Sequence, residues 1–207
     1  MFITFEGLDS SGKSTQAELT SRKLTDSGEK VVFLREPGGT RLGEQIRSIL
    51  LDVNSNIEPV AEVFLFSAAR AQLVREVIQP SLARGEIVIC DRFVDSTTTY
   101  QGYGRGIPPG DIRAINRLAI DDILPDLTFF IDISLDEIEK RQRNAGKIID
   151  RMERSGRKFF ERTRNGYFEL SRTEKRLHII NGERSPQKIF NEIWLIIQQE
   201  VHRTSVE

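Results

Sequence analysis

The sequence predicts an α/β fold, in which a doubly wound parallel sheet of about five strands is flanked by helices. Short apolar runs, as strands buried in a parallel sheet require, alternate along the chain with longer stretches of helical periodicity. The first run leads directly into a glycine-rich motif that opens a helix. Because strands that alternate with helices favour parallel crossover connections, these observations indicate one α/β unit.

Five runs are the expected strands, at residues 2–5, 31–34, 87–90, 127–133 and 176–180. The second is entirely apolar, which predicts a strand buried on both faces. The fourth has Asp132 as its one charged member, and the third contains the single cysteine, Cys90. A lone cysteine cannot form an intramolecular disulfide, so we expect a small buried hydrophobic side chain.

Helical spacing of apolar residues and flanking Gly and Pro residues define the expected helices. They begin near Lys13 and continue through 15–25, then cover 41–51, 58–83, 111–124, 135–143 and 156–172, with a last helix capped by Ser185 and Pro186. Residues 93–106 are rich in hydroxyls, tyrosine and glycine, which predicts a ligand-facing loop with a short helix. Phe190 and Trp194, four residues apart, are expected to pack in the core.

Composition excludes several classes of partner. The formal net charge of −1 and the pI near 6.2 give no general electrostatic attraction to nucleic acid or to an anionic membrane. The apolar runs are too short for a membrane span or for the core of a signal peptide. We therefore expect a soluble cytoplasmic protein, with any basic cluster confined to a local site.

The glycine-rich motif follows the first strand and reads GLDSSGKST, which matches G-x-x-x-x-G-K-[ST]. Glycine permits the unusual dihedrals and the close backbone approach that a loop around a polyphosphate needs. The start of the following helix and the charge of Lys13 attract the same phosphates, and Ser14 is placed to ligate Mg²⁺. A solvated turn is the alternative. The expected triphosphate site comprises Gly7, Leu8, Asp9, Ser10, Ser11, Gly12, Lys13, Ser14 and Thr15.

Further charged residues follow the next strands, at the edge where ligands of open α/β sheets bind. Arg35 follows the second strand, and Asp91 and Arg92 follow the third. Two arginines beside a triphosphate loop indicate a second phosphate-bearing substrate. A phosphomonoester, with a second pKa of about 6, is already an anionic nucleophile at neutral pH, so no general base is needed. Asp91 either holds a magnesium-bound water or pairs with a neighbouring arginine.

Residues 144–154 read NAGKIIDRMER and carry a high density of charge. This pattern is typical both of a solvated loop and of an arginine-rich lid that closes on phosphates, and the residues alone leave both interpretations open.

Five motifs in this order resemble thymidylate kinases, and the resemblance runs over essentially the whole chain. They are FEGLDSSGKST, REPGGT, LFSAAR, DRFVDSTTTYQGYGRG and PDLTFFIDI. The resemblance implies a P-loop nucleoside monophosphate kinase fold, as a single domain over residues 1–207 with a short mobile lid at about 143–155. It also implies transfer of the γ-phosphoryl group of ATP to dTMP with Mg²⁺, and a homodimer formed through helices near the long central one.

The resemblance also assigns residues at matching positions. It places Asp9 at the 3′-hydroxyl of the acceptor sugar, and Arg35 and Arg92 at the acceptor phosphate. Phe66 matches the aromatic residue that stacks on thymine, although its periodicity alone favours core packing. Tyr100 matches the tyrosine that crowds the 2′ position of the sugar. The alternative for both Tyr100 and Gln101 is a structural role, in which they only hold their loop in place. The pocket for base and sugar then comprises Phe66, Arg70, Ser96, Thr97, Tyr100 and Gln101, with Arg70 donating to a pyrimidine carbonyl.

One departure from some family members lies in the phosphate loop, where residues 8–11 include no basic side chain. This resembles the branch of the family in which an arginine of the lid supplies the missing charge. Arg141 and Arg143 are then expected at the ATP phosphates, and Arg151 at the transferred phosphoryl group. The implied catalytic residues are Asp9, Lys13, Arg92 and Arg151.

Two other functions compete with this interpretation. A deoxynucleoside kinase would need a carboxylate base near a neutral sugar hydroxyl, and Glu36 is available for that role. A nucleotide-dependent regulatory switch would explain the phosphate loop but not the arginines beside it.

Overall fold

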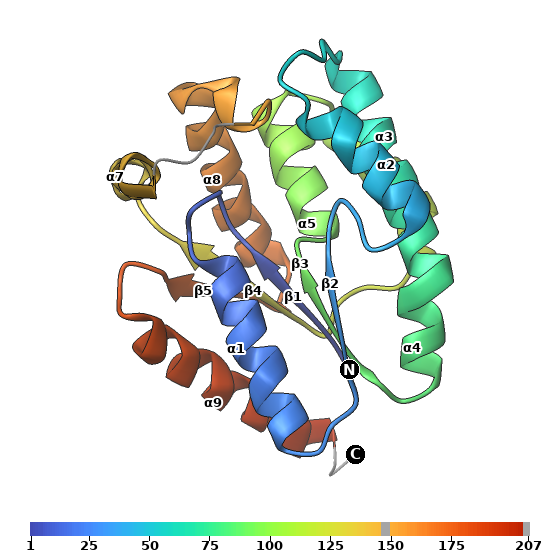
Figure 1. Cartoon of the computed structure of the whole chain (residues 1–207), viewed down its shortest axis with the longest axis vertical. Helices are drawn as coiled ribbons and strands as arrows, with labels where there is room; N and C mark the ends of the chain where they lie inside the picture. Colours follow the sequence, from blue (N-terminus) through green and yellow to red (C-terminus); the bar gives the residue numbers. More distant parts are fainter. Residues whose placement is uncertain (146–149, 205–207) are drawn as a thin grey trace.

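A parallel sheet of five strands, in the order β2-β3-β1-β4-β5, forms the middle layer of the computed structural model, which describes residues 1–145 and 150–204 (Figure 1). Every neighbouring pair of strands is parallel. The predicted fold class is therefore confirmed. The strands are β1 (Phe2–Glu6), β2 (Val31–Arg35), β3 (Ile87–Asp91), β4 (Leu127–Asp132) and β5 (Leu177–Asn181).

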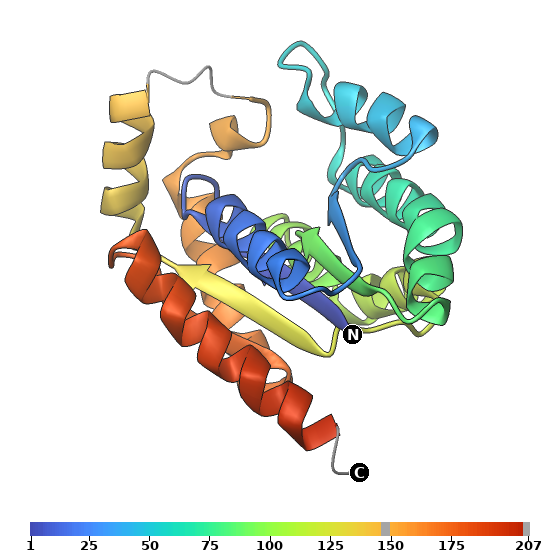
Figure 2. The same ribbon diagram turned by 60° about the horizontal axis from the view of Figure 1, so that its bottom comes forward.

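Helices cover both faces of the sheet (Figure 2). On one face, α1 and α9 pack on β1, β4 and β5 around Phe5, Phe129 and Ile193, which are all fully buried. On the other face, the helices α3, α5, α6 and α8 cover the sheet.

The helices along the chain are α1 (Lys13–Asp26), α2 (Arg41–Leu51), α3 (Pro59–Leu73), α4 (Gln79–Ala83), α5 (Val94–Thr97), α6 (Pro109–Ile120), α7 (Leu135–Ala145), α8 (Arg157–Thr173) and α9 (Pro186–Thr204). The chain also has two π-helical segments, η1 (Val74–Ile78) and η2 (Thr98–Gly104), and a 3₁₀ turn, η3 (Glu153–Ser155).

The prediction that residues 31–34 form a strand buried on both faces is wrong. In the strand order β2 lies at the edge of the sheet, so it has only β3 as a neighbour. Phe33 is 41% exposed and lines a large cavity instead of entering the core. The all-apolar run at 31–34 is therefore an edge strand from which Phe33 faces a cavity.

Residues 93–106 were predicted to form a ligand-facing loop with a short helix, but most of the segment is helical, because η2 follows α5 without a break. Thr97, Thr99 and Gln101 are buried, so the segment is part of the packed structure and not a surface loop. The predicted helix at 58–83 is confirmed as an uninterrupted helical run, with η1 joining α3 to α4. Cys90 is buried in the core, as predicted, and burial raises the pKa of its thiol well above the ordinary value.

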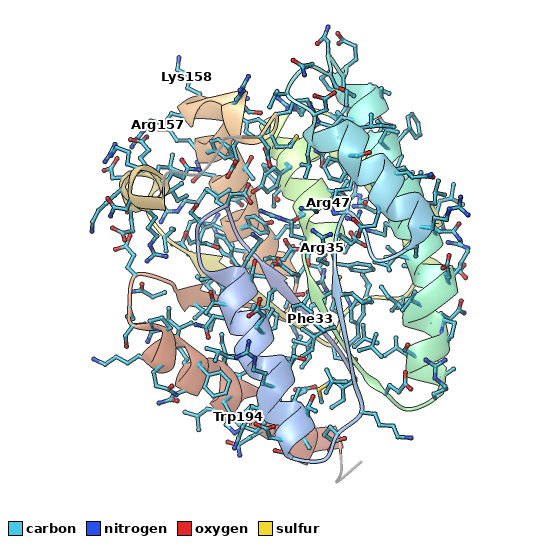
Figure 3. All side chains as sticks on the ribbon, in the orientation of Figure 1. Phe33, Arg35, Arg47, Arg157, Lys158 and Trp194 are labelled. Atoms are coloured by element: carbon cyan, nitrogen blue, oxygen red, sulfur yellow. The ribbon has the colours of Figure 1, made fainter. Side chains whose placement is uncertain are left out.

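Trp194 of α9 is partly buried against the core beside Phe190, as predicted, with Lys23 of α1 over its ring (Figure 3). Within residues 1–145 and 150–204, no helix is long and apolar enough to cross a membrane.

Two glycines let η2 and α8 pack closely. A Cβ atom on Gly104 would lie 2.6 Å from Cε2 of Phe159 and 2.8 Å from Oγ1 of Thr163. A Cβ atom on Gly166 of α8 would lie 2.8 Å from the ring of Tyr103. Glycine at these positions is therefore required by the close approach of the two helices, whatever ligand the segment binds.

We predict that Gly104→Ala lowers the free energy of unfolding by about 1 to 3 kcal/mol, because the added methyl group overpacks a closed interface. Urea denaturation followed by circular dichroism measures the change. Gly110→Ala is the matched control, since a Cβ atom at Gly110 meets no atom within 4 Å. Equal stability of the two variants would contradict the packing role of Gly104.

Candidate active site

A cavity of about 400 Å³ opens at the carboxyl edge of the sheet, between the loop after β1 and the helices α2, α3 and η2. Parallel strands place the loops that follow them at this same edge, which is why sequence-distant residues meet there. The predicted site residues that line the cavity are Asp9, Ser10, Lys13, Ser14, Arg35, Phe66, Arg70, Asp91, Arg92, Ser96, Thr97, Tyr100 and Gln101.

The loop after β1 has the backbone geometry that its glycines predict. Gly7 has φ 147° and Gly12 has φ 95°, both in the region that glycine adopts readily. A Cβ atom on Gly7 would lie 2.7 Å from the carbonyl oxygen of Ile131, so the loop runs directly against β4. Leu8 is buried and packs in the core, and α1 begins at Lys13. The loop thus presents its backbone and the start of α1 to the cavity.

Lys13 lies between two carboxylates and is 7% exposed. Its Nζ is 3.7 Å from Oδ1 of Asp9 and 3.9 Å from Oδ1 of Asp91. Burial and the nearby charge of Arg92 lower its pKa, while the two carboxylates act in the opposite direction. The ammonium group is therefore held at the cavity with little water around it, where its charge acts strongly on a ligand.

Arg92 connects the loop after β1 with the loop after β3. Its guanidinium donates to the carbonyl of Gly7 at 2.8 Å, to Oγ of Ser96 at 3.1 Å and to Oδ1 of Asp9 at 2.8 Å. It also lies over the ring of Tyr100, at 5.1 Å from the centroid. Arg92 has φ 73°, an uncommon backbone conformation for a residue with a side chain. The contacts with Gly7 and Asp9 place its charge beside the phosphate loop.

Asp91 contacts the hydroxyl of Ser14, and its second oxygen, Oδ1, is buried without a hydrogen-bond partner among the described residues. The ion pair of Asp91 is with Lys13. Among the interactions described, no arginine forms an ion pair with Asp91 itself, although the charge of Asp91 acts on the neighbouring Arg92. The two oxygens of Ser14 and Asp91 lie side by side at the cavity.

Glu6, at the end of β1, is fully buried behind this edge, and sequence analysis did not select it. Its carboxylate accepts hydrogen bonds from the backbone of Phe93 at 2.8 Å, from Oγ of Ser96 at 2.6 Å and from the hydroxyl of Tyr167 at 2.7 Å. Burial and the nearby charge of Asp95 raise the pKa of Glu6 to about 7. Because Ser96 in turn accepts from Arg92, Glu6 supports the arginine from behind.

Arg70 is almost completely buried, with 1% exposure. It forms an ion pair with Glu36 and donates to Oγ1 of Thr97 at 2.7 Å and to the carbonyl of Phe93 at 3.0 Å. Glu36, the base considered for a deoxynucleoside kinase, is held by this arginine, although burial raises its pKa. Both residues line the cavity.

A further arginine, Arg47 of α2, lines the cavity and was not predicted. Figure 3 shows Arg35 and Arg47 together at the carboxyl end of β2, above Phe33. Arg35 is exposed and pairs with Glu44 at 3.0 Å, while Arg47 donates to the carbonyl of Pro37 at 2.9 Å. Burial and the charge of Arg35 lower the pKa of Arg47. The sequence did contain a signal for Arg47: it is a cationic residue on the polar side of the helix at 41–51, which closely follows the motif REPGGT.

The three arginines predicted at or near the lid take different positions. From α7, Arg141 donates to the carbonyls of Ser10 at 3.2 Å and Ser11 at 3.1 Å, so it contacts the phosphate loop directly. Arg143 is exposed on α7. Arg151 does not line the cavity: it lies 2.7 Å from Oε2 of Glu62 and donates to the carbonyl of Leu50. Residues 146–149 of the predicted lid lie outside the described part of the chain.

A phosphate loop at the end of a central strand, with arginines facing it across one cavity, defines the class of P-loop nucleoside monophosphate kinases. The model of the thymidylate kinase family matches residues 5–193, and the chain belongs to this family. The resemblance found in the sequence motifs is thereby confirmed at the level of the family.

Individual relatives agree over nearly the full length. The thymidylate kinase of Thermosipho africanus is 47% identical, over 97% of this chain and 99% of its own. That of Pelodictyon phaeoclathratiforme is 48% identical over 85% of each chain. The crystal structure of thymidylate kinase from Ehrlichia chaffeensis superimposes with a TM-score of 0.77 at 36% identity, covering 95% of this chain and 98% of that one.

Proposed function

We propose that the chain, as a single kinase domain over residues 1–207, transfers the γ-phosphoryl group of ATP to dTMP, giving ADP and dTDP for dTTP synthesis. The observation that carries the proposal is one cavity, lined both by residues of the phosphate loop and by Phe66, Tyr100 and Gln101. Arg35 and Arg92 line it as well. Such a cavity suits two substrates whose phosphates meet and whose second base is enclosed.

The donor phosphates would be held by the loop backbone, the N-terminus of α1 and Lys13. Arg141 donates hydrogen bonds to the carbonyls of Ser10 and Ser11 and so stabilises the conformation of the loop. Because the loop includes no basic side chain between its two glycines, Lys13 is the only cation of the motif itself.

The acceptor phosphate would bind at Arg35 and Arg92, with Asp9 accepting from the 3′-hydroxyl of the sugar. Its anionic oxygen attacks the γ-phosphorus directly, so the protein's contribution is alignment and charge neutralisation. Arg92 suits both purposes, because its bonds to the carbonyl of Gly7 and to Asp9 fix it relative to the donor loop.

The base would stack on Phe66, with Arg70 donating to a pyrimidine carbonyl and Ser96, Thr97 and Gln101 completing the pocket. Tyr100 is buried at 6% exposure beneath the guanidinium of Arg92, which fixes its ring near the sugar. A 2′-hydroxyl would then have to fit against this ring or lose its hydration, which favours deoxyribose.

Ser14 and Asp91 would hold Mg²⁺, directly or through water. Hydroxyl and carboxylate oxygens are the ligands that this cation prefers. Oδ1 of Asp91, which lies 3.9 Å from Nζ of Lys13 and has no hydrogen-bond partner among the described residues, is available to it. The residues present therefore fit the ion, and none of the described residues forms a cluster of three or more His, Cys, Asp or Glu that would hold a metal elsewhere. When bound with ATP, Mg²⁺ would neutralise charge on the phosphates.

The lid, at about 143–155, would supply the charge that the loop lacks, with Arg143 near the ATP phosphates and Arg151 at the transferred phosphoryl group. For this, Arg151 must leave Glu62. The exchange is feasible because Arg105 also pairs with Glu62, at 3.1 Å, so the buried carboxylate keeps a cationic partner.

A homodimer is proposed through α2, α3 and α6. These helices expose large apolar side chains, including Ile49 at 49%, Val60 and Phe64 at 57% each, and Leu118 at 77%. Clustered exposed apolar side chains are typical of protein interfaces.

We also propose that the protein is cytoplasmic, where ATP is available. Recovery of the protein in a cell-envelope fraction would contradict this location.

A coupled assay for ADP with ATP and Mg²⁺ tests the central proposal. We predict rapid turnover with dTMP, and at least a hundredfold lower kcat/KM with thymidine, because a neutral acceptor leaves Arg35 and Arg92 without a phosphate to bind. Omitting Mg²⁺ should abolish turnover. A preference for thymidine would establish a deoxynucleoside kinase, and failure of dTMP to bind in equilibrium dialysis would favour a regulatory switch.

For the lid, we predict that Arg151→Ala lowers kcat with ATP and dTMP by about a thousandfold, by analogy with arginine fingers, and changes the KM for dTMP much less. Arg154→Ala, an exposed arginine of the same segment, is the matched control and should keep nearly full turnover. Unchanged turnover of Arg151→Ala would show that this arginine has only the structural role seen at Glu62.

For the dimer, we predict that Phe64→Glu yields a monomer in sedimentation equilibrium, because a charge in an apolar interface must be desolvated. Leu195→Glu on α9 is the control, since Leu195 is exposed to a similar extent, 59%, on a helix outside the proposed interface. Dissociation by both variants, or by neither, would contradict the assignment of the interface.

A further inference from the structure

Glu62 of α3 is a fully buried carboxylate to which the mechanism above gives no role beyond pairing with Arg151 and Arg105. Four donor groups surround it. Oε1 accepts from Nε2 of Gln101 at 2.9 Å and from Nε of Arg105 at 3.1 Å, and Oε2 accepts from Nη2 of Arg105 at 3.1 Å and lies 2.7 Å from Nη1 of Arg151. Since a carboxylate offers about four acceptor positions, Glu62 is fully engaged.

The surroundings keep Glu62 ionised. Burial alone would raise its pKa, but the hydrogen bonds from Arg105 and Gln101 and the charge of Arg105 outweigh this effect, and the pKa lies below its ordinary value. An ionised carboxylate has acceptors only. Every group that faces Glu62 must therefore face it with a donor.

This requirement fixes the amide of Gln101. The NH₂ and C=O ends of a glutamine amide have nearly the same shape, and a half-turn exchanges them. Facing an acceptor-only partner, only the orientation with Nε2 toward Glu62 is favourable. Gln101 lines the cavity beside Phe66 and Tyr100. The amide oxygen, on the opposite branch, is then the acceptor that remains for a ligand in the cavity.

On the basis of the proposed function, we propose that Glu62 is a positioning residue that determines base selectivity, by holding Gln101 so that its amide oxygen accepts from the N3–H group of thymine or uracil. Cytosine has a lone pair at N3 in place of this hydrogen. If cytosine were bound, its N3 and the amide oxygen of Gln101 would both be acceptors, so no hydrogen bond could form and both groups would be buried without a partner. Sites that hydrogen-bond a particular group reject analogues without it strongly.

The test compares the dissociation constants of dUMP and dCMP, measured by titration calorimetry. Neither ligand has the 5-methyl group, so the pair differs at N3, which Gln101 would contact, and at C4, where a carbonyl could accept from Arg70. Because Arg70 is unchanged in every variant, a change in the ratio between variants reports the contact of Gln101. We expect the wild-type protein to prefer dUMP. In Glu62→Gln, whose amide can face Gln101 with either end, this preference should fall by about tenfold or more. The ratio of dTMP to dUMP affinity, which reports contacts of the methyl group, should stay within twofold.

Two variants distinguish positioning from general damage. Arg105→Lys changes another partner of the same carboxylate but keeps a positive charge beside it and leaves the bond from Gln101, so it should retain the dUMP preference. In a Gln101→Ala background, Glu62→Gln should have no further effect on the ratio, because Glu62 acts through Gln101. Gln101→Ala alone should lower the preference at least as far as Glu62→Gln does, and this result remains decisive if Glu62→Gln does not fold.

Each remaining outcome decides between the proposals. An unchanged dUMP-to-dCMP ratio in folded Glu62→Gln, or an equal loss of affinity for all three nucleotides, would overturn the positioning role while leaving the proposed kinase activity intact. Failure of the wild-type protein to bind dTMP would instead overturn the proposed function.

Discussion

The bonds of Arg92 are the interaction on which the arrangement of the site depends. One guanidinium group joins the carbonyl of Gly7, the carboxylate of Asp9 and the hydroxyl of Ser96, so the loops after β1 and β3 hold a fixed separation. Glu6 supports the same hydroxyl from inside the sheet. The relative position of the two loops is thus determined by a short chain of hydrogen bonds anchored in the core.

The sequence predicted the parts of the molecule that local pattern determines. The phosphate loop, the five strands and most helices follow from glycine spacing, apolar runs and helical periodicity. The edge position of β2 was missed because strand order is a long-range property. Glu6 interrupts an apolar run and looks like a strand end, while its partner Tyr167 lies far along the chain. Glu62 was missed for the same reason, because its partners Gln101, Arg105 and Arg151 come from distant segments. Arg47 was missed although a local signal was available.

The site was predicted best where a residue projects from a strand end and worst where it depends on a partner. Arg35 and Asp91 are the last residues of β2 and β3, so topology alone brings them to the cavity. Arg151 has no such constraint, and in the structure its charge is satisfied by a buried carboxylate. For Arg151 to serve at the proposed phosphate site, that site would have to compete with Glu62 for its guanidinium group.

Cys90 gives this architecture a built-in reporter. It is the single cysteine of the chain, is fully buried in β3, and immediately precedes Asp91. A thiol reagent can reach it only when the sheet opens beside the site, so the rate of alkylation measures how often that opening occurs. Ligands that bind the closed sheet must slow the reaction in proportion to their affinity. Occupancy of the cavity can therefore be followed from the core side, without any label at the substrates.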